Sequence, residues 1–232
     1  MATDYSASYS ASPVASLGAD ARISFIKRTY GHLFAAIVGF TAVEAWLFVT
    51  GMAEAIARAM LGTSWLLILG AFMIVGVLAS WTAARAQSLP VQYAALGGFV
   101  LAEALIFVPL LFLANRYAPG TISSAALVTL LGFAGLTAVA FVSGKDFSFL
   151  RSILMWVGVG ALLLIAASLI FGFQLGTVFS VVMVAFAGAS ILYSTSRILR
   201  TYPEDRYVSA ALELFASVAL MFWYVLRLMS RE

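Results

Sequence analysis

Two apolar sequences, TVFSVVMVAFAGASILYSTSRIL (177–199) and YVSAALELFASVALMFWYVLRLM (207–229), decide the fold together with the link RTYPEDR (200–206) between them. Each is long enough to cross a bilayer as a helix, which takes about 20 residues. The link is short and contains Pro203, so we expect the two helices to be antiparallel neighbours. The second helix carries Glu213 inside its apolar run. Because a carboxylate is costly in hydrocarbon, it usually faces a protein interior or water and marks a functional site.

The composition of the whole chain is that of an integral membrane protein. Of its 232 residues, 63% are hydrophobic and 10% are charged, whereas a soluble domain carries roughly 25% charged residues. The partner that this composition predicts is therefore the lipid bilayer. The small excess of 13 Lys and Arg over 10 Asp and Glu reports membrane topology and does not indicate nucleic-acid binding.

The residue types also limit the chemistry that the chain can perform. There is no cysteine and His32 is the single histidine, which excludes thiol catalysis and disulfides and makes a histidine metal site unfavourable. The sequence contains no H-E-x-x-H pair, and the serine of VSGKD (142–146) has no base partner to make it a nucleophile. We therefore expect a protein that is not an enzyme and that has no cofactor and no resident metal.

Seven windows of the chain qualify as membrane spans, and the links between them are short and hold most of the charges. The windows are 30–50, 62–84, 91–114, 122–143, 150–172, 177–199 and 207–229. The sequence thus predicts an all-α membrane protein with seven transmembrane helices. Residues 1–24 are rich in Ser and Ala and lack the pattern of a signal peptide, so we expect a disordered tail followed by one transmembrane domain over residues 25–232.

The distribution of basic residues predicts the orientation of the spans. Nine Lys and Arg fall on the side of the amino terminus and four on the other side. Because basic residues are in excess on the cytoplasmic side of membrane proteins, we expect the amino terminus in the cytoplasm and the carboxyl terminus outside. An odd number of spans agrees with this arrangement.

Three glutamates lie inside predicted spans. Glu44 falls in the outer half of the first span, Glu103 near the middle of the third, and Glu213 near the cytoplasmic end of the seventh. Depth alone favours a functional or gating role for Glu103, whereas Glu44 is expected to be structural or interfacial.

Helical spacing relates Glu213 to the helix before it. Ser217 lies one turn after Glu213, and Ser194 and Arg197 share a face of the preceding helix. Since these helices are joined by a short link, we expect Arg197 to reach Glu213, with Ser194 and Ser217 deeper. One interpretation is a polar track that gates or conducts cations or protons. The other is an ion pair with interhelical hydroxyl bonds that only hold the bundle together.

Four pieces of the sequence, in this order and spacing, resemble the bacterial Bax inhibitor-1/YccA family. They are FIKRTYGHLFAAI (25–37), SGKDFSFLRSILMWVGVGALLLIA (143–166), GASILYSTSRIL (188–199) and EDRYVSAALELFASVALMFWYVLRLM (204–229). The resemblance covers about residues 22–229. It implies a protein of the bacterial inner membrane with seven spans, six of them surrounding the seventh, and a cytoplasmic amino terminus.

The resemblance implies two activities. Calcium-leak members of the family carry two membrane aspartates that act as a pH-sensitive latch, but the matching positions here are Ser194 and Ser217. Two hydroxyls cannot share a proton as two carboxyls do, so we expect Glu213, with Arg197, to take over the latch of a calcium or proton leak. The YccA branch instead resembles a substrate and modulator of the membrane AAA protease FtsH, and residues 1–24 would be the segment that the protease engages.

Overall fold

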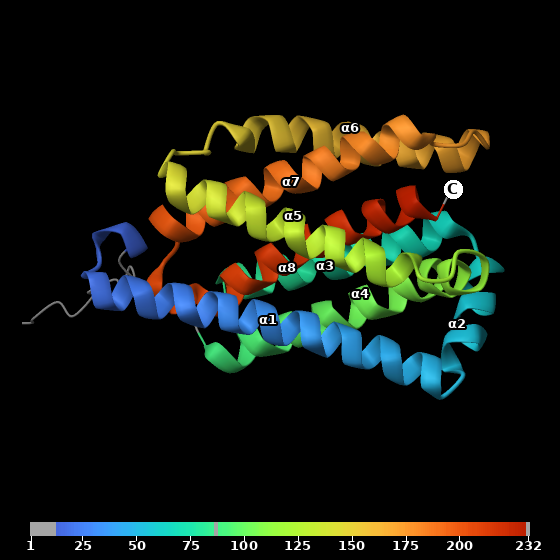
Figure 1. The fold of residues 1–232 in the computed structure, drawn as a ribbon, viewed down its shortest axis with the longest axis horizontal. Coiled ribbons are helices and arrows are strands. Elements are labelled where there is room, and N and C mark those ends of the chain that lie inside the picture. The colour runs from blue at the N-terminus through green and yellow to red at the C-terminus, as the bar shows by residue number, and fades with distance from the viewer. Residues whose placement is uncertain (1–12, 86–87, 231–232) are drawn as a thin grey trace, which may run out of the picture.

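The structure, a computed structural model that describes residues 13–85 and 88–230, is a bundle of long helices (Figure 1). In order these are η1 (Val14–Ser16), α1 (Ala19–Val49), α2 (Met52–Leu61), α3 (Trp65–Arg85), α4 (Leu89–Tyr117), α5 (Thr121–Ser143), α6 (Leu150–Phe171), α7 (Thr177–Arg200), η2 (Glu204–Arg206) and α8 (Tyr207–Met229). Seven of the described helices are long and apolar enough to cross a membrane, and α2 is not one of them. The predicted fold class and the number of spans are confirmed.

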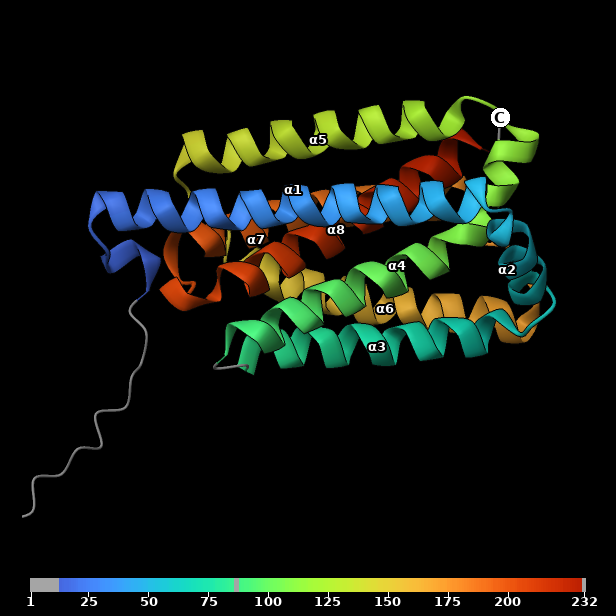
Figure 2. The ribbon, with the colours of Figure 1, turned by 90° about the horizontal axis from the view of Figure 1, so that it is seen from below.

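The last helix, α8, is the core of the bundle, as the resemblance implied. It runs through the middle of the molecule in both overall views (Figure 1; Figure 2) and packs against α1, α3, α4, α5 and α7. Fourteen residues of α8 are buried, whereas Ala161 is the one buried residue of the peripheral helix α6. Side chains of α6 therefore face lipid or a cavity, while those of α8 face other helices.

A group of aromatic rings fixes α8 to its neighbours. Phe107 of α4 stacks on Phe222 of α8 with ring centroids 5.5 Å apart, and its edge meets Trp223 at 5.0 Å. About two turns before Phe222 in α8, Phe215 packs edge-on against Phe99 of α4. Aromatic pairs of this geometry add about 0.5–1.5 kcal/mol each beyond the burial of their surface, so these rings stabilise the contact between α4 and α8.

The helix α2 differs from the prediction, which treated residues 51–61 as a link. The left-handed backbone of Gly51, with φ of 76°, turns the chain between α1 and α2. The helix then packs against α4 through buried Ala53 and Ala57 and leaves Glu54 and Arg58 paired on its exposed face. This amphipathic helix, α2, lies at one end of the bundle (Figure 2).

The first span begins earlier than predicted, at Ala19, and the residues before it are ordered. Val14 of η1 is fully buried, and its N–H donates to the carbonyl oxygen of Tyr202 in the link between α7 and α8 at 2.9 Å. The prediction of a disordered tail is therefore wrong for residues 13–24. For residues 1–12 it lies outside the described residues.

The two ends of the bundle differ in what they hold. One end of the bundle holds the short helix η1, the start of α1 and the link between α7 and α8 (Figure 1). We call it the amino-terminal end. The helix α2 and the carboxyl end of α8 lie at the opposite end (Figure 1). The basic residues at the amino-terminal end, which include Arg22, Lys27 and Arg28, are those that predicted a cytoplasmic location.

Candidate functional site

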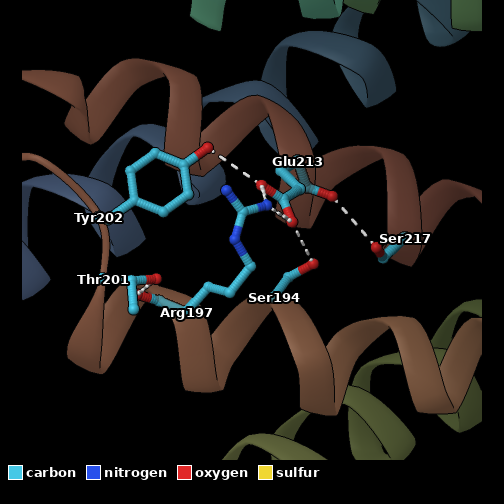
Figure 3. A network of polar contacts seen from close by, with 6 residues as sticks. All are labelled: Ser194, Arg197, Thr201, Tyr202, Glu213 and Ser217. Carbon is cyan, nitrogen blue, oxygen red and sulfur yellow. Dashed lines mark hydrogen bonds and ion pairs between the residues drawn. The ribbon is translucent and has the colours of Figure 1, made fainter. Parts of the chain in front are cut away.

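Glu213 lies in the second turn of α8, near the amino-terminal end of the bundle. Its carboxylate is the centre of a polar cluster (Figure 3). Arg197 of α7 donates from Nη1 to both carboxylate oxygens at 3.0 Å. Ser194 donates its hydroxyl to Oε1 at 2.8 Å, and the hydroxyl of Tyr202 donates to Oε2 at 3.0 Å. We call Ser194, Arg197, Tyr202 and Glu213 the Glu213 cluster. The predicted contact of Arg197 with Glu213 is confirmed.

The backbone at the end of α7 explains how Ser194, Arg197 and Tyr202 all come to face Glu213. The carbonyl oxygen of Arg197 accepts the N–H groups of both Thr201 and Tyr202, at 2.8 and 3.0 Å, which closes the last turn of α7. Pro203 cannot continue a helix, so the chain turns there and returns as α8. Tyr202 thus lies between the two helices with its ring buried. Sequence reasoning missed Tyr202, although a tyrosine just before the proline of a short link was a usable signal.

The charges of the cluster are held in a half-buried setting. The side chain of Glu213 is 27% exposed and that of Arg197 is 39% exposed. The guanidinium of Arg197 also lies over the rings of Tyr193 and Tyr202, at 5.5 and 5.1 Å from their centroids. Burial and the neighbouring Glu213 carboxylate raise the pKa of the Tyr202 hydroxyl, so Tyr202 remains a protonated donor at neutral pH. Every oxygen of the carboxylate therefore meets a donor.

The two serines that the sequence resemblance matched to latch positions make different contacts in the structure. Ser194 belongs to the cluster, as described. Ser217 is buried and donates its hydroxyl to the backbone oxygen of Glu213 at 3.1 Å, within its own helix (Figure 3). The structure therefore brings Ser194, Arg197 and Glu213 together and leaves Ser217 as a neighbour one turn away.

Glu103 is not part of this cluster. It lies in the middle of α4, is 7% exposed, and faces a cavity of about 670 Å³ between α3, α4, α6, α7 and α8. A second cavity, of about 220 Å³, lies between α1, α4, α5 and α8 and is lined by Glu44. Both carboxylate oxygens of Glu44 are buried without a hydrogen-bond partner among the described residues. Glu213 lines neither cavity.

Among the described residues, Glu213 is a paired carboxylate at one end of the bundle, and Glu44 and Glu103 are carboxylates without an ion-pair partner deeper in it. Within the described parts of the chain, no three His, Asp or Glu side chains gather as ligands for a metal ion. The carboxylates of Glu44, Glu103 and Glu213 are the groups of the arrangement that can accept or release a proton.

Comparison with known proteins places the chain among membrane proteins. The family described as "Inhibitor of apoptosis-promoting Bax1" matches residues 22–232. An uncharacterized membrane protein of Vibrio cholerae serotype O1 is 35% identical over 116 residues, which is 48% of this chain and 50% of that protein. A protein of vaccinia virus strain Lister named "Golgi anti-apoptotic protein" is 26% identical over 226 residues, or 94% of this chain and 90% of the viral one.

Proposed function

Because the chain belongs to the Bax inhibitor-1 family of membrane proteins, we propose that it is a pH-sensitive cation leak that the Glu213 cluster closes. The observation that carries the proposal is the carboxylate of Glu213, held by three donors from α7 and the following link. It lies in α8, which packs against α1, α3, α4, α5 and α7. An intramembrane carboxylate with a named partner is by default a functional candidate.

The cluster acts as a closure in this proposal. In the described conformation Arg197 neutralises Glu213, and neither cavity includes Glu213 in its lining. Protonation of Glu213 would remove the charge that holds Arg197, while Tyr202 and Ser194 would keep only neutral hydrogen bonds. The helices α7 and α8 could then separate at this end and connect the cavities lined by Glu103 and Glu44 with the aqueous phase. Calcium or protons are the ions that the family resemblance implies.

Ion flux into vesicles tests this proposal directly. The chain is reconstituted in liposomes loaded with a calcium dye or a proton dye, and initial rates are recorded from pH 6 to 8 for the wild type, Glu213→Gln and Arg197→Gln. Glu54→Gln is the matched control, because Glu54 forms an ion pair with Arg58 on the exposed face of α2. Faster flux in both cluster variants and not in the control supports the closure. Vesicles that stay tight in every variant at every pH refute it.

A location in the bacterial inner membrane with the amino terminus in the cytoplasm belongs to the same proposal. The excess of basic residues at the amino-terminal end supports it. Since the chain lacks cysteine, single cysteines can be introduced at Asp146 and Thr63, which are exposed at opposite ends of the bundle. A membrane-impermeant thiol reagent applied to intact cells should label Thr63→Cys and not Asp146→Cys. The reverse pattern would refute the orientation.

A second candidate function is that of a non-conducting substrate and modulator of the membrane AAA protease FtsH. The observation that favours it is the absence of the family's acidic latch: Ser217 bonds to its own helix and not to Ser194. The segment that a protease would engage is the start of the chain. Deleting residues 2–12 leaves η1 and its contact with the link intact, so loss of degradation by the protease in this variant would support the second function.

A further inference from the structure

The cavity that contains Glu103 has the size and lining of a site for a small organic molecule. Its volume of about 670 Å³ falls in the range of ligand pockets, roughly 300–1,000 Å³. The lining is mainly aliphatic and aromatic, with rings that include Phe72, Phe99, Phe107 and Trp223. Along α8 it extends from Ala216 to Arg227, which is about 16 Å of helix. We call it the Glu103 cavity.

The carboxylate of Glu103 is the charged group deep in this apolar space. The residue is more than nine-tenths buried, and no described residue donates a hydrogen bond to it or forms an ion pair with it. A buried carboxylate without a donor is expensive, and this one faces open volume rather than a packed wall. The position is thus complementary to a positive charge carried by an apolar body.

Arg227 is the second charged residue that lines the cavity. It lies near the carboxyl end of α8, at the end of the bundle that holds α2, and its Nη2 donates to the carbonyl oxygen of Leu175 at 3.2 Å. This contact holds the guanidinium against the link between α6 and α7. The cavity therefore has its acidic group in the middle of α4 and its basic group in the last turn of α8.

The cavity can be reached from the hydrocarbon of the bilayer. Val77 of α3 is 65% exposed and Leu162 of α6 is 40% exposed, yet both line the cavity. The space between α3 and α6 is therefore open to the side, where the protein meets lipid. A molecule that dissolves in the membrane could enter there without passing Arg227.

We propose that the Glu103 cavity binds a lipophilic organic cation, that is, a delocalised or shielded positive charge on an aromatic or aliphatic body. Glu103 would supply the opposite charge, and the surrounding rings would add cation–π attraction, which strengthens when the cation is desolvated. This inference goes beyond the proposed leak and does not depend on it, because the Glu213 cluster contributes no residue to the cavity.

The test is binding of tetraphenylphosphonium to the purified full-length chain in lipid nanodiscs, with empty nanodiscs as the blank. Tetraphenylborate has the same shape and the opposite charge. We expect saturable binding of one phosphonium per chain and weaker binding of the borate. Glu103→Gln, which keeps the shape of the side chain, should raise the Kd at least about tenfold, since it removes a buried charged partner.

Two further variants separate charge from space. Glu44→Gln removes an equally buried carboxylate from the smaller cavity and should leave the Kd unchanged. Ala161→Phe should weaken binding by filling part of the Glu103 cavity while Glu103 remains.

Three results would overturn the proposal: no saturable binding above empty nanodiscs, a Glu103→Gln variant that binds as the wild type does, or borate that binds as tightly as phosphonium. The last two would mean that the cavity accepts apolar molecules or lipid chains without recognising charge.

Discussion

Replacing Glu213 by glutamine should speed ion flux through the protein by about thirtyfold. Four hydrogen bonds reach the Glu213 carboxylate, two of them from Arg197. In the variant one oxygen remains an acceptor, while the amide nitrogen meets the donors Arg197 and Tyr202. The closed state therefore loses its ionic contact and at least one hydrogen bond.

The size of the effect follows from the exposure of the pair. Hydrogen bonds to charged groups contribute about 1.5–3 kcal/mol, whereas exposed ion pairs contribute about 0.2–1 kcal/mol. With Glu213 27% and Arg197 39% exposed, solvent screening reduces the higher range, and we take about 2 kcal/mol. If the open state is rare and flux follows its population, 2 kcal/mol corresponds to roughly a thirtyfold rise.

The assay is the initial rate of dye signal in vesicles that contain equal amounts of folded protein. The charge-swapped double variant, Arg197→Glu with Glu213→Arg, should return the rate toward that of the wild type, because it restores an ion pair between α7 and α8. A Glu213→Gln rate equal to or below that of the wild type would refute the closure. So would a double variant that leaks as fast as either single variant, since the pair itself would then not hold the closed state.

The remaining predictions concern the elements around the cluster and the core. Tyr202→Phe keeps the ring under Arg197 but removes one donor to Glu213, so the flux should rise about fivefold, for a loss of about 1 kcal/mol. Val14→Asp places a charge in a fully buried position; limited proteolysis should then cut near residues 13–18 faster than it does in the wild type. Phe107→Ala should lower the free energy of unfolding by about 3–5 kcal/mol, measured by denaturation in detergent, because Phe107 is 1% exposed and contacts two aromatic rings of α8. Glu44→Met should stabilise the protein by about 1–3 kcal/mol, because it removes a buried acceptor without a partner; a loss of stability would mean that Glu44 is bonded in the membrane.

The fold was predictable because hydropathy alone separates spans from links. The bounds of α6, α7 and α8 agree with the predicted spans to within one residue. The start of α1 was missed because residues 19–29 carry charges that end an apolar window, although they continue the helix. The helix α2 was missed because its ten residues are too few for a span, and its signal was the spacing of Glu54 and Arg58 by four residues.

The site was predictable where it depends on helical spacing and unpredictable where it depends on the link. Ser194, Arg197 and Glu213 share facing sides of two consecutive helices, which periodicity reveals. The place of Tyr202 depends on how the chain turns at Pro203. The cavity next to Glu103 depends on the distance between α3 and α6. The sequence pattern of a single helix does not predict the distance between two other helices.

The contact of Val14 with Tyr202 also connects the start of the chain mechanically to the link between α7 and α8. One residue, Tyr202, accepts the backbone N–H of Val14 and donates its hydroxyl to Glu213. A force that pulls on the start of the chain would therefore load the link between α7 and α8 before it unwinds α1. Mechanical extraction from this end would first load Tyr202, which also donates to Glu213, so tension on the start of the chain should change the ion flux.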